Sequence, residues 1–380
     1  MSAAQIAPLN LRECFEDFDD PRREHGRLHS LWDIIALTIC GMICGCNEVY
    51  EIQEYGKSKI DFLRTFLDLE NGIPSHDTIG RVFSMLDPKA FRDCFAAWVE
   101  SLAQSFEGRH IAIDGKTLRH SYEKGERPLH LVSAFAADNR LVLTQQAVDE
   151  KSNEITAIPE LLKTLNVKKA IITIDAMGCQ KEIAAQIIDL KGDYLLSLKE
   201  NQPNLHAQTS EMFCNGLDTE FEGMKHEECQ TTDKKNHGRT ETRTYHMIQP
   251  SKAWLKGHPE WKGLRTLAMV FSVREEEGKE PTCETRFYIS SLTLNVSRFA
   301  DLSRNHWGIE TKLHWVLDIS YREDENRSRK DYTAENLAWI RRATASMVAQ
   351  HNSPGGVNCK RKRAGWDDEV LVEIAGNAIA

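Results

Sequence analysis

Two aspartates stand at positions where phosphate chemistry can be built. Asp114 follows the apolar run at residues 110–113, and Asp175 follows a second apolar run at residues 169–174. In an α/β sheet, strand ends are where side chains converge on a shared crevice. Hydrolysis or transfer of a phosphodiester needs an activated oxygen nucleophile and a stabilised leaving oxygen, which two Mg²⁺ ions about 4 Å apart provide. Because hard cations select carboxylate oxygens, the pattern predicts a divalent-metal site with both aspartates as ligands.

A third ligand is expected from residues 304–318, interpreted as a helix. His306, Glu310 and His314 have the spacing i, i+4, i+8 and share one face of that helix. Four apolar residues lie on its other side: Ile309, Leu313, Val316 and Leu317. Glu310 can thus point into the crevice while its helix packs. We expect a DNA or metal contact from His306 more than from His314, against the alternative that exposed helix histidines have no role.

The order of the surrounding elements indicates the fold. Three strand-like runs come in succession, and helices then alternate with strands. The expected strands are 110–116, 129–136, 141–148, 169–175 and 194–199, and the expected helices are 158–165 and 181–190. This is the order of an RNase H-like core, an α/β fold with a mixed sheet flanked by helices, although it is not unique to that fold.

The chain around this core divides into three predicted stretches. Residues 1–106 form an N-terminal helical, DNA-binding subdomain, residues 107–350 the catalytic domain, and residues 351–380 a basic tail with a short helix. Residues 205–295 break the alternation and are interpreted as an inserted, mostly β segment. Two more helices are expected before the tail, at 302–315 and 334–350.

A short amphipathic helix is predicted within the N-terminal stretch, where Pro74 and Ser75 form its start. His76, Arg81 and Ser84 are then available for solvent or for phosphates, which is a weak helix-turn-helix pattern. A small helical subdomain that packs on the next domain is an equally supported alternative.

Several motifs, taken in order, resemble those of a known family. They are Asp-Gly-Lys at 114–116, Asp-Ala-Met-Gly-Cys-Gln at 175–180, Tyr-Leu-Leu-Ser-Leu-Lys-Glu-Asn-Gln at 194–202, His-Gly-Arg-Thr-Glu-Thr-Arg at 237–243, and His-Trp-Gly-Ile-Glu at 306–310. On these residues the sequence resembles the H-repeat-associated branch of bacterial insertion-sequence transposases. The resemblance runs from about Phe15 to Asp368. The stretches at 18–22 and 74–79 resemble that branch's N-terminal associated region.

The resemblance implies an RNase H-like catalytic domain of the DDE type, with an insertion before the last acidic residue. It makes Asp114, Asp175 and Glu310 the catalytic, metal-binding carboxylates, with Mg²⁺ as cofactor and Mn²⁺ as a substitute. The sequence departs from the broader group, which carries Tyr, Arg and Lys around the Glu, where this chain has Ser303, His306 and Leu317. The phosphate contacts of those residues therefore do not carry over. Replacements are expected from Arg304, His306 or Lys312, and further DNA contacts from His237 and Arg239.

Other basic and polar residues flank the predicted crevice. Lys116 and Arg119 follow Asp114 and are expected to bind phosphate, unless they belong to a solvated turn. Lys199, Asn201 and Gln202 end the strand next to that of Asp175, where they could hold the DNA backbone or orient the metal ligands. The run at 360–363, Lys-Arg-Lys-Arg, could grip phosphates or be a solvated tail.

Composition limits the remaining classes. A formal net charge of −9 and a pI of about 5.9 argue against a general polyanion binder, so any DNA affinity must come from local cationic patches. Among ten cysteines only Cys40, Cys44 and Cys46 cluster, and core packing explains them better than zinc. Residues 1–12 lack the features of a secretory leader and no run is long enough to cross a bilayer, so we expect no membrane and a cytoplasmic location.

The leading hypothesis is metal-dependent strand cleavage at the ends of an insertion sequence, followed by strand transfer into target DNA. The expected partner is double-stranded DNA, held by a homodimer or higher assembly because two ends must be brought together. One alternative is an RNase H-like nuclease or resolvase that does not join strands. Another is a catalytically silent DNA-binding remnant of a mobile element. A zinc hydrolase fits poorly because no His-Glu-x-x-His motif occurs.

Overall fold

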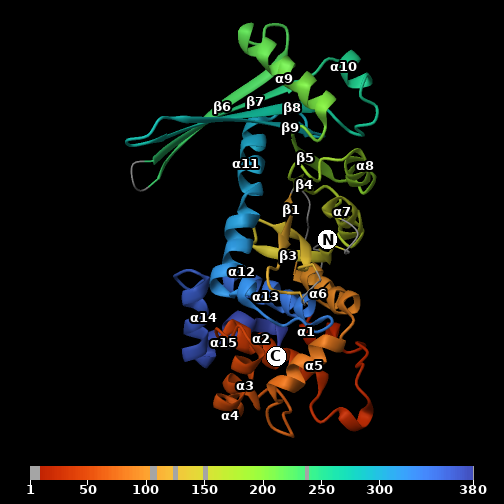
Figure 1. Ribbon diagram of the computed structural model, residues 1–380, viewed down its shortest axis with the longest axis vertical. Helices are drawn as coiled ribbons and strands as arrows, with labels where there is room; N and C mark the ends of the chain where they lie inside the picture. Colours follow the sequence, from red (N-terminus) through yellow and green to blue (C-terminus); the bar gives the residue numbers. More distant parts are fainter. Residues whose placement is uncertain (1–8, 103–108, 123–126, 149–152, 236–238, 380) are drawn as a thin grey trace, which may run out of the picture. The chain divides into compact units, whose positions relative to one another are not determined.

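The chain packs as two compact units that alternate along the sequence. The computed structural model (Figure 1) describes residues 9–102, 109–122, 127–148, 153–235 and 239–379. The predicted DNA contact His237 therefore lies outside the described residues. Unit 1 consists of Met1–Ser105, Gly115–Lys151 and Ile309–Ala380, and unit 2 consists of Phe106–Asp114 and Ser152–Gly308. Packing thus joins the two ends of the chain in one unit, whereas the boundaries predicted at residues 106 and 350 follow chain order.

Unit 1 is built from helices and one β-hairpin. Its elements are α1 (Leu11–Cys14), η1 (Glu24–Gly26), α2 (Leu31–Ile43), α3 (Val49–Ser58), α4 (Ile60–Leu63), α5 (His76–Met85), α6 (Pro88–Leu102), β2 (His130–Ala136), β3 (Leu141–Ala147), the π-helix η2 (Glu310–His314), α12 (Trp315–Ser320), η3 (Glu323–Glu325), α13 (Thr333–Gln350), α14 (Val357–Trp366), α15 (Asp368–Ala375) and η4 (Gly376–Ala378). The tail therefore holds two helices and a short 3₁₀ turn where the sequence predicted a single short helix.

Helix α13 forms the centre of unit 1. It is buried over most of its length and contacts α2, α5 and α6. The ring of Trp339 on α13 stacks on that of Phe95 on α6, with centroids 5.8 Å apart. The predicted start of α5 is confirmed, because the Ser75 hydroxyl caps the helix by accepting from the backbone N–H of Thr78 at 3.2 Å.

Unit 2 contains most of the sheet and the helices that flank it. Its elements are β1 (His110–Thr117, in this unit as far as Asp114), α7 (Glu154–Lys163), β4 (Ile171–Ile174), α8 (Lys181–Asp189), β5 (Asp193–Leu198), α9 (Pro203–Asp218), β6 (Lys225–Lys235), β7 (Arg239–Gln249), α10 (Lys252–Lys256), β8 (Thr266–Glu276), β9 (Thr282–Ser290) and α11 (Val296–His306).

The sheet is mixed, as predicted. Its strand order is β3-β2-β1-β4-β5-β9-β8-β7-β6, and the two units divide within β1. Strands β1, β4 and β5 are parallel neighbours, whereas β5, β9, β8, β7 and β6 pair antiparallel. Three successive strands followed by alternating helices and strands, with helices on the sheet, form the predicted RNase H-like α/β fold.

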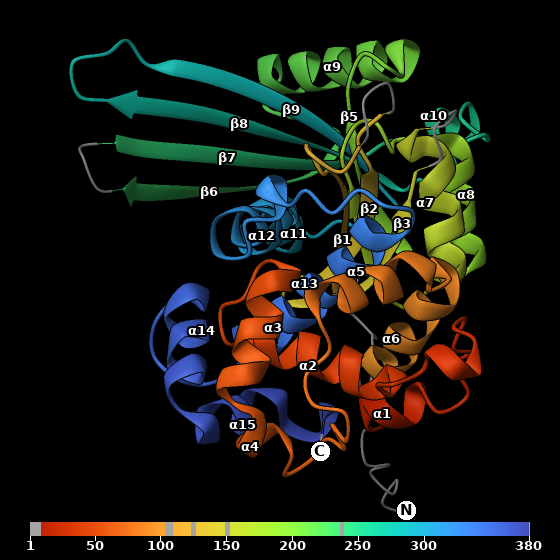
Figure 2. The same cartoon turned by 60° about the horizontal axis from the view of Figure 1, so that its bottom comes forward.

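The insertion contains one long helix that the sequence analysis missed. Pro203 begins α9, a position that proline suits because its missing N–H needs no partner there, and buried Leu205, Thr209 and Phe213 recur every four residues. Four long strands follow, which confirms the β character of the rest (Figure 2).

These strands carry a helix on each face. Tyr245, Val270 and Tyr288 lie on one face and pack against Phe299 of α11. Phe287, on the opposite face, packs against Phe213 of α9, with ring centroids 5.9 Å apart. Alternate side chains therefore point to opposite faces, as β geometry requires. The paired strands, with α9 on one side, are visible in Figure 2.

The last predicted helix before residue 334 starts earlier and is interrupted. Helix α11 begins at Val296, where Asn295 accepts from the backbone N–H of Arg298 at 2.9 Å. A five-residue π-helical turn, Glu310–His314, then precedes α12. Such wide turns are rare, and they occur frequently at functional sites.

Candidate active site

Asp114 and Asp175 lie at the same edge of the unit 2 sheet. Strands β1 and β4 are parallel neighbours, and their last paired residues are Ile113 and Ile174. Asp114 is the next residue of β1, which continues to Thr117, and Asp175 is the residue that follows β4. Their backbones therefore lie one interstrand spacing of about 4.8 Å apart. Both are half-buried. The structure thus brings the two carboxylates together, but only Asp175 follows the end of its strand as predicted, whereas Asp114 lies within β1.

The environment of Asp175 disfavours its negative charge. Its Oδ1 accepts backbone hydrogen bonds from Met177 and Gly178, at 3.1 and 3.3 Å. Burial raises the pKa of this carboxyl and the nearby charge of Glu154 raises it further, against the opposing effects of the two hydrogen bonds and of Lys199. Among the described residues, no lysine or arginine forms an ion pair with Asp175. A carboxylate desolvated in this way suits a divalent cation, so the residues present fit a metal site.

The loop after Asp175 is held in place by two amide side chains. Asn201 Nδ2 donates to the carbonyl oxygen of Ala176 at 2.7 Å, and Gln202 Nε2 donates to that of Cys179 at 3.0 Å. Gly178 is required here because a Cβ at this position would lie 2.3 Å from Cγ2 of Ile174. Of the two predicted alternatives for Asn201 and Gln202, these contacts support orienting the ligand loop. Lys199 is exposed and stays a predicted DNA contact.

Glu310 is the first residue of the π-helical turn and belongs to unit 1. Its side chain is exposed, whereas Leu313 in the same turn is buried. His306 belongs to unit 2, whereas Glu310 and His314 belong to unit 1, and the shared face of the three residues stays a prediction. The role of Glu310 as the third metal ligand stays a prediction.

His306 lies inside unit 2. Its Nδ1 is 2.9 Å from the hydroxyl of Thr173, which is in turn 2.7 Å from Nε2 of His110. Burial lowers the pKa of His306 to about 4, so the ring is neutral at physiological pH. The prediction that His306 contacts DNA or a metal is therefore wrong, because the ring serves a buried hydrogen-bonded chain. His314 in unit 1 is also neutral, because burial and the charges of Arg342 and Lys116 lower its pKa to about 3.

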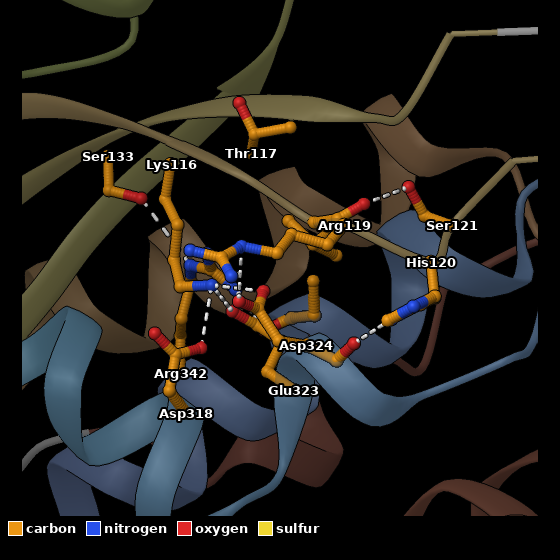
Figure 3. A network of polar contacts seen from close by, with 12 residues as sticks. Lys116, Thr117, Arg119, His120, Ser121, Ser133, Asp318, Glu323, Asp324 and Arg342 are labelled. Atoms are coloured by element: carbon orange, nitrogen blue, oxygen red, sulfur yellow. Dashed lines mark hydrogen bonds and ion pairs between the residues drawn. The ribbon is translucent and has the colours of Figure 1, made fainter.

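Lys116 is buried in an ion-pair network within unit 1 (Figure 3). Its Nζ lies 2.8 Å from Asp318, 2.9 Å from Asp324 and 3.6 Å from Glu323. Glu323 is fully buried and also accepts from Arg342 at 2.7 Å. The prediction that Lys116 binds phosphate is wrong, because acidic side chains from residues 318–324 already surround its charge. Sequence analysis missed these acidic partners, although three of them fall within seven consecutive residues.

The other predicted phosphate contacts differ in how far they are engaged. Arg119 is exposed and pairs only with Asp324, at 3.2 Å, among the described ion pairs. Arg304 pairs with Asp233 at 2.5 Å, and Arg239 with Glu241 at 3.5 Å. These three arginines and the half-buried Lys312 stay predictions.

The basic run at residues 360–363 is part of helix α14 in unit 1. Arg361 is 1% exposed and donates to the carbonyl oxygens of Met42 and Cys46, at 2.8 and 2.9 Å. Its guanidinium also lies 3.8 Å from the ring centroid of Tyr321. Arg361 therefore holds α14 against α2, and the predictions of a phosphate-gripping run and of a solvated tail are both wrong for this residue.

Ser84, predicted to be available on α5, is buried and donates to the carbonyl oxygen of Arg81 at 2.9 Å. The side chain of His76 has one partner, with Nδ1 2.9 Å from Oε1 of Gln53.

Within the described parts of the chain, we find no helix with the length and hydropathy that a bilayer-spanning segment needs.

Comparison with known proteins places the chain in a family. The model described as Transposase DDE domain matches residues 105–348, and the one described as DDE_Tnp_1-associated matches residues 12–99. The H repeat-associated YhhI of Escherichia coli strain K12, which carries a transposase name, is 41% identical over 93% of this chain and 94% of its own. YncI of Escherichia coli O157:H7, also named as a transposase, is 40% identical over 93% and 91%.

A shorter relative shows that membership alone does not establish activity. YbfQ of Escherichia coli strain K12, named an inactive transposase, is 46% identical over 17% of this chain and 77% of its own. Transposases with a DDE domain act on DNA and use divalent metal ions, and Asp114 and Asp175 on the neighbouring strands of this chain fit that use. With matches over most of its length, the chain belongs to the family of transposases with a DDE domain.

Proposed function

We propose that this protein is an active DNA transposase that cleaves the ends of an insertion sequence and joins them to target DNA. The observation that carries the proposal is the position of Asp114 and Asp175 beside each other on the neighbouring parallel strands β1 and β4, in a chain that matches the DDE family over residues 105–348. Glu310 is proposed as the third catalytic carboxylate, presented from the π-helical turn.

The metal ligands in this proposal are Asp114, Asp175 and Glu310, with Mg²⁺ as the ion and Mn²⁺ as a substitute. When bound, the ions supply Lewis-acid stabilisation of the charge that develops on phosphate oxygens. The chain itself supplies orientation. The backbone N–H groups of Met177 and Gly178 hold one oxygen of Asp175, and Asn201 and Gln202 fix the loop that carries those N–H groups.

DNA would be bound by basic side chains that the fold leaves at the surface. We propose Lys199, whose charge acts on Asp175, and Arg119, which follows Asp114 in the sequence, as phosphate contacts. Further proposed contacts are Arg239, Arg304 and Lys312, together with His237, which lies outside the described residues. Because affinity would come from local cations on an acidic chain, binding should weaken steeply with salt. Double-stranded DNA ends are brought together by a homodimer or higher assembly in this proposal.

The test is a strand-transfer assay with a duplex that carries the element end, in Mg²⁺ and in Mn²⁺. Asp175→Asn is expected to reduce cleavage and joining by about 1000-fold, which corresponds to ~4 kcal/mol of transition-state stabilisation. The matched control is Glu182→Gln, which neutralises an exposed carboxylate in the first turn of α8 and should leave activity unchanged.

Each alternative has its own outcome in this assay. Unchanged strand transfer by Asp175→Asn would show that the metal assignment is wrong. Cleavage by the wild-type protein without joined products would indicate a nuclease or resolvase. Binding of the end duplex without cleavage in either ion would indicate a catalytically silent remnant of a mobile element.

A further inference from the structure

A second group of potential metal ligands lies in the inserted sheet, on β6 and β7. Glu228 is directly opposite His246 in the antiparallel pairing, and His226 is two residues before Glu228 on β6. Residues directly opposite each other share a face, as do residues two apart on one strand. His226, Glu228 and His246 therefore project from the same face, the one opposite to the Tyr245 face that packs on α11. Strands β6 and β7 are seen side by side in Figure 2.

The distances between their ligand atoms match those around one tetrahedral ion. His226 Nε2 is 3.1 Å from His246 Nδ1, which is 3.5 Å from a carboxylate oxygen of Glu228. All three ligand atoms lie within 4.8 Å of one another. Bonds of about 2.1 Å to a tetrahedral Zn²⁺ place neighbouring ligand atoms about 3.4 Å apart. The separations of 3.1 and 3.5 Å lie on either side of that value.

We propose that His226, Glu228 and His246 bind a zinc-class transition-metal ion that clips β6 to β7. Two imidazole nitrogens and one carboxylate oxygen suit Zn²⁺, whereas Mg²⁺ prefers oxygen ligands only. Three protein ligands leave one coordination position, and the partly exposed Glu228 leaves that position open to water. The site is distinct from Asp114 and Asp175, which offer oxygen atoms alone.

Phe221 holds both imidazole rings in position. Its ring stacks on that of His226, with the ring centroids 3.7 Å apart and an angle of 7° between the ring planes. The centroid of the His246 ring lies 5.6 Å from that of Phe221. The backbone of Phe221 has φ 58°, and its N–H donates to the carbonyl oxygen of Gly216 at 2.7 Å. Gly216 has no side chain to collide with that ring, since a Cβ there would lie 2.4 Å away. The end of α9 thus fixes the rings that would bind the metal.

The rings can present their facing nitrogens as ligands without a change of charge. In the hydrogen bond between His226 Nε2 and His246 Nδ1, one nitrogen carries the hydrogen and the other a lone pair. Metal binding needs a lone pair on both, so the hydrogen moves to the second nitrogen of its own ring. Each imidazole remains neutral in this exchange. A hydrogen-bonded pair of histidines that never binds metal is the alternative outcome of the test.

The test is titration of the full-length, metal-stripped protein with Co²⁺, followed by visible absorption. A tetrahedral site with two imidazoles gives intense d–d bands, whereas an oxygen-only octahedral site gives weak ones. We expect one equivalent of intensely absorbing Co²⁺, which one equivalent of Zn²⁺ displaces and excess Mg²⁺ does not. The bands should persist in Asp175→Asn, which separates this site from the proposed catalytic one.

Matched variants decide the assignment. His226→Gln and Glu228→Gln should each weaken Co²⁺ binding by roughly 100-fold or more, because even residues that only support a ligand contribute about 10- to 100-fold. The controls are His258→Gln and Glu211→Gln, a histidine and an exposed carboxylate of unit 2 outside the cluster. Circular dichroism of each variant shows that it is folded. Absence of intense bands in the wild type, or their persistence in both His226→Gln and His246→Gln, would overturn the proposal.

Discussion

Folding has opposite net effects on the pKa values of two carboxylates, Glu323 in unit 1 and the proposed metal ligand Asp175 in unit 2. Glu323 of unit 1 is fully buried, yet its pKa is lowered, because Arg342, Lys116 and Arg341 outweigh desolvation. Asp175 of unit 2 is less buried, yet its pKa is raised, because burial outweighs two backbone hydrogen bonds and the charge of Lys199. The same functional group is thus neutralised by protein cations in one place and left short of positive charge in the other.

The difference separates structural acids from candidate metal ligands. A carboxylate with its own arginine and lysine gains nothing from an added cation, and losing a partner leaves a buried charge. A carboxylate without such partners is destabilised until a cation arrives. This contrast, rather than the presence of acidic residues, supports the proposed divalent-ion site at Asp175.

The contrast predicts a large loss of stability in unit 1. Glu323→Gln leaves Arg342 and Lys116 buried with less negative charge, and it should lower the free energy of unfolding by ~3–5 kcal/mol. Urea denaturation followed by circular dichroism measures this change. The control is Glu325→Gln, whose partner Arg322 is exposed, and it should have little effect.

A double variant checks the cause. Arg342→Met combined with Glu323→Gln removes both charges of the 2.7 Å pair, so it should be less destabilising than the sum of the two single variants. If the losses of unfolding free energy in the two single variants simply add in the double variant, the two charges do not stabilise each other. The conclusion that Arg342 offsets the burial of the Glu323 charge would then be wrong.

At the other carboxylate, stability should depend on the divalent ion. With Mg²⁺ at 100 times its dissociation constant, the wild-type protein should gain about 2.7 kcal/mol, and Asp175→Asn should gain much less. Mg²⁺ suits this measurement because the imidazoles of the proposed zinc-class site bind it poorly. Without divalent ions, Asp175→Asn should be at least as stable as the wild type, since the substitution removes a desolvated charge.

A destabilised Asp175→Asn protein in metal-free buffer would contradict the contrast between the two carboxylates. It would mean that the ionised side chain stabilises the fold by itself, through its hydrogen bonds with Met177 and Gly178. Asp193→Asn is not a suitable control, because Asp193 accepts from Ser291 at 2.8 Å and so has a structural partner of its own. Glu182→Gln, on the exposed first turn of α8, is the better one.

Sequence patterns predicted what depends on local order along the chain. The strands beside Asp114 and Asp175 follow from apolar runs, although β1 extends beyond Asp114 to Thr117, and the start of α5 follows from Ser75. The roles of Lys116 and Arg361 could not be predicted, because each depends on partners brought close only by folding, at residues 318–324 for Lys116 and at residues 42–47 for Arg361. The π-helical turn at Glu310 could not be predicted, because the apolar residues Ile309, Leu313, Val316 and Leu317 have the spacing of an ordinary α-helix.

The smallest effect that we predict is a dependence of the stability on pH, caused by the burial of His306 in unit 2. Only desolvation acts on the pKa of His306, which lies near 4 in the folded protein against an ordinary value of 6.5. Below pH 6.5 the unfolded chain therefore takes up a proton that the folded chain excludes, so stability falls as pH drops from 6.5 towards 4. The loss can reach ~1.4 kcal/mol for each pH unit.

His306→Gln isolates this contribution, because glutamine can still bond to the Thr173 hydroxyl but does not titrate. The difference in unfolding free energy between the wild type and His306→Gln should shift in favour of the variant as pH falls from 7 to 5. The exposed His25, replaced by Gln in the same way, should produce a much smaller shift. If the difference in unfolding free energy stays constant across this range, the His306 ring must contact an opposite charge or water in the folded protein. His306 would then not share with Asp175 a burial cost that the fold leaves without compensation.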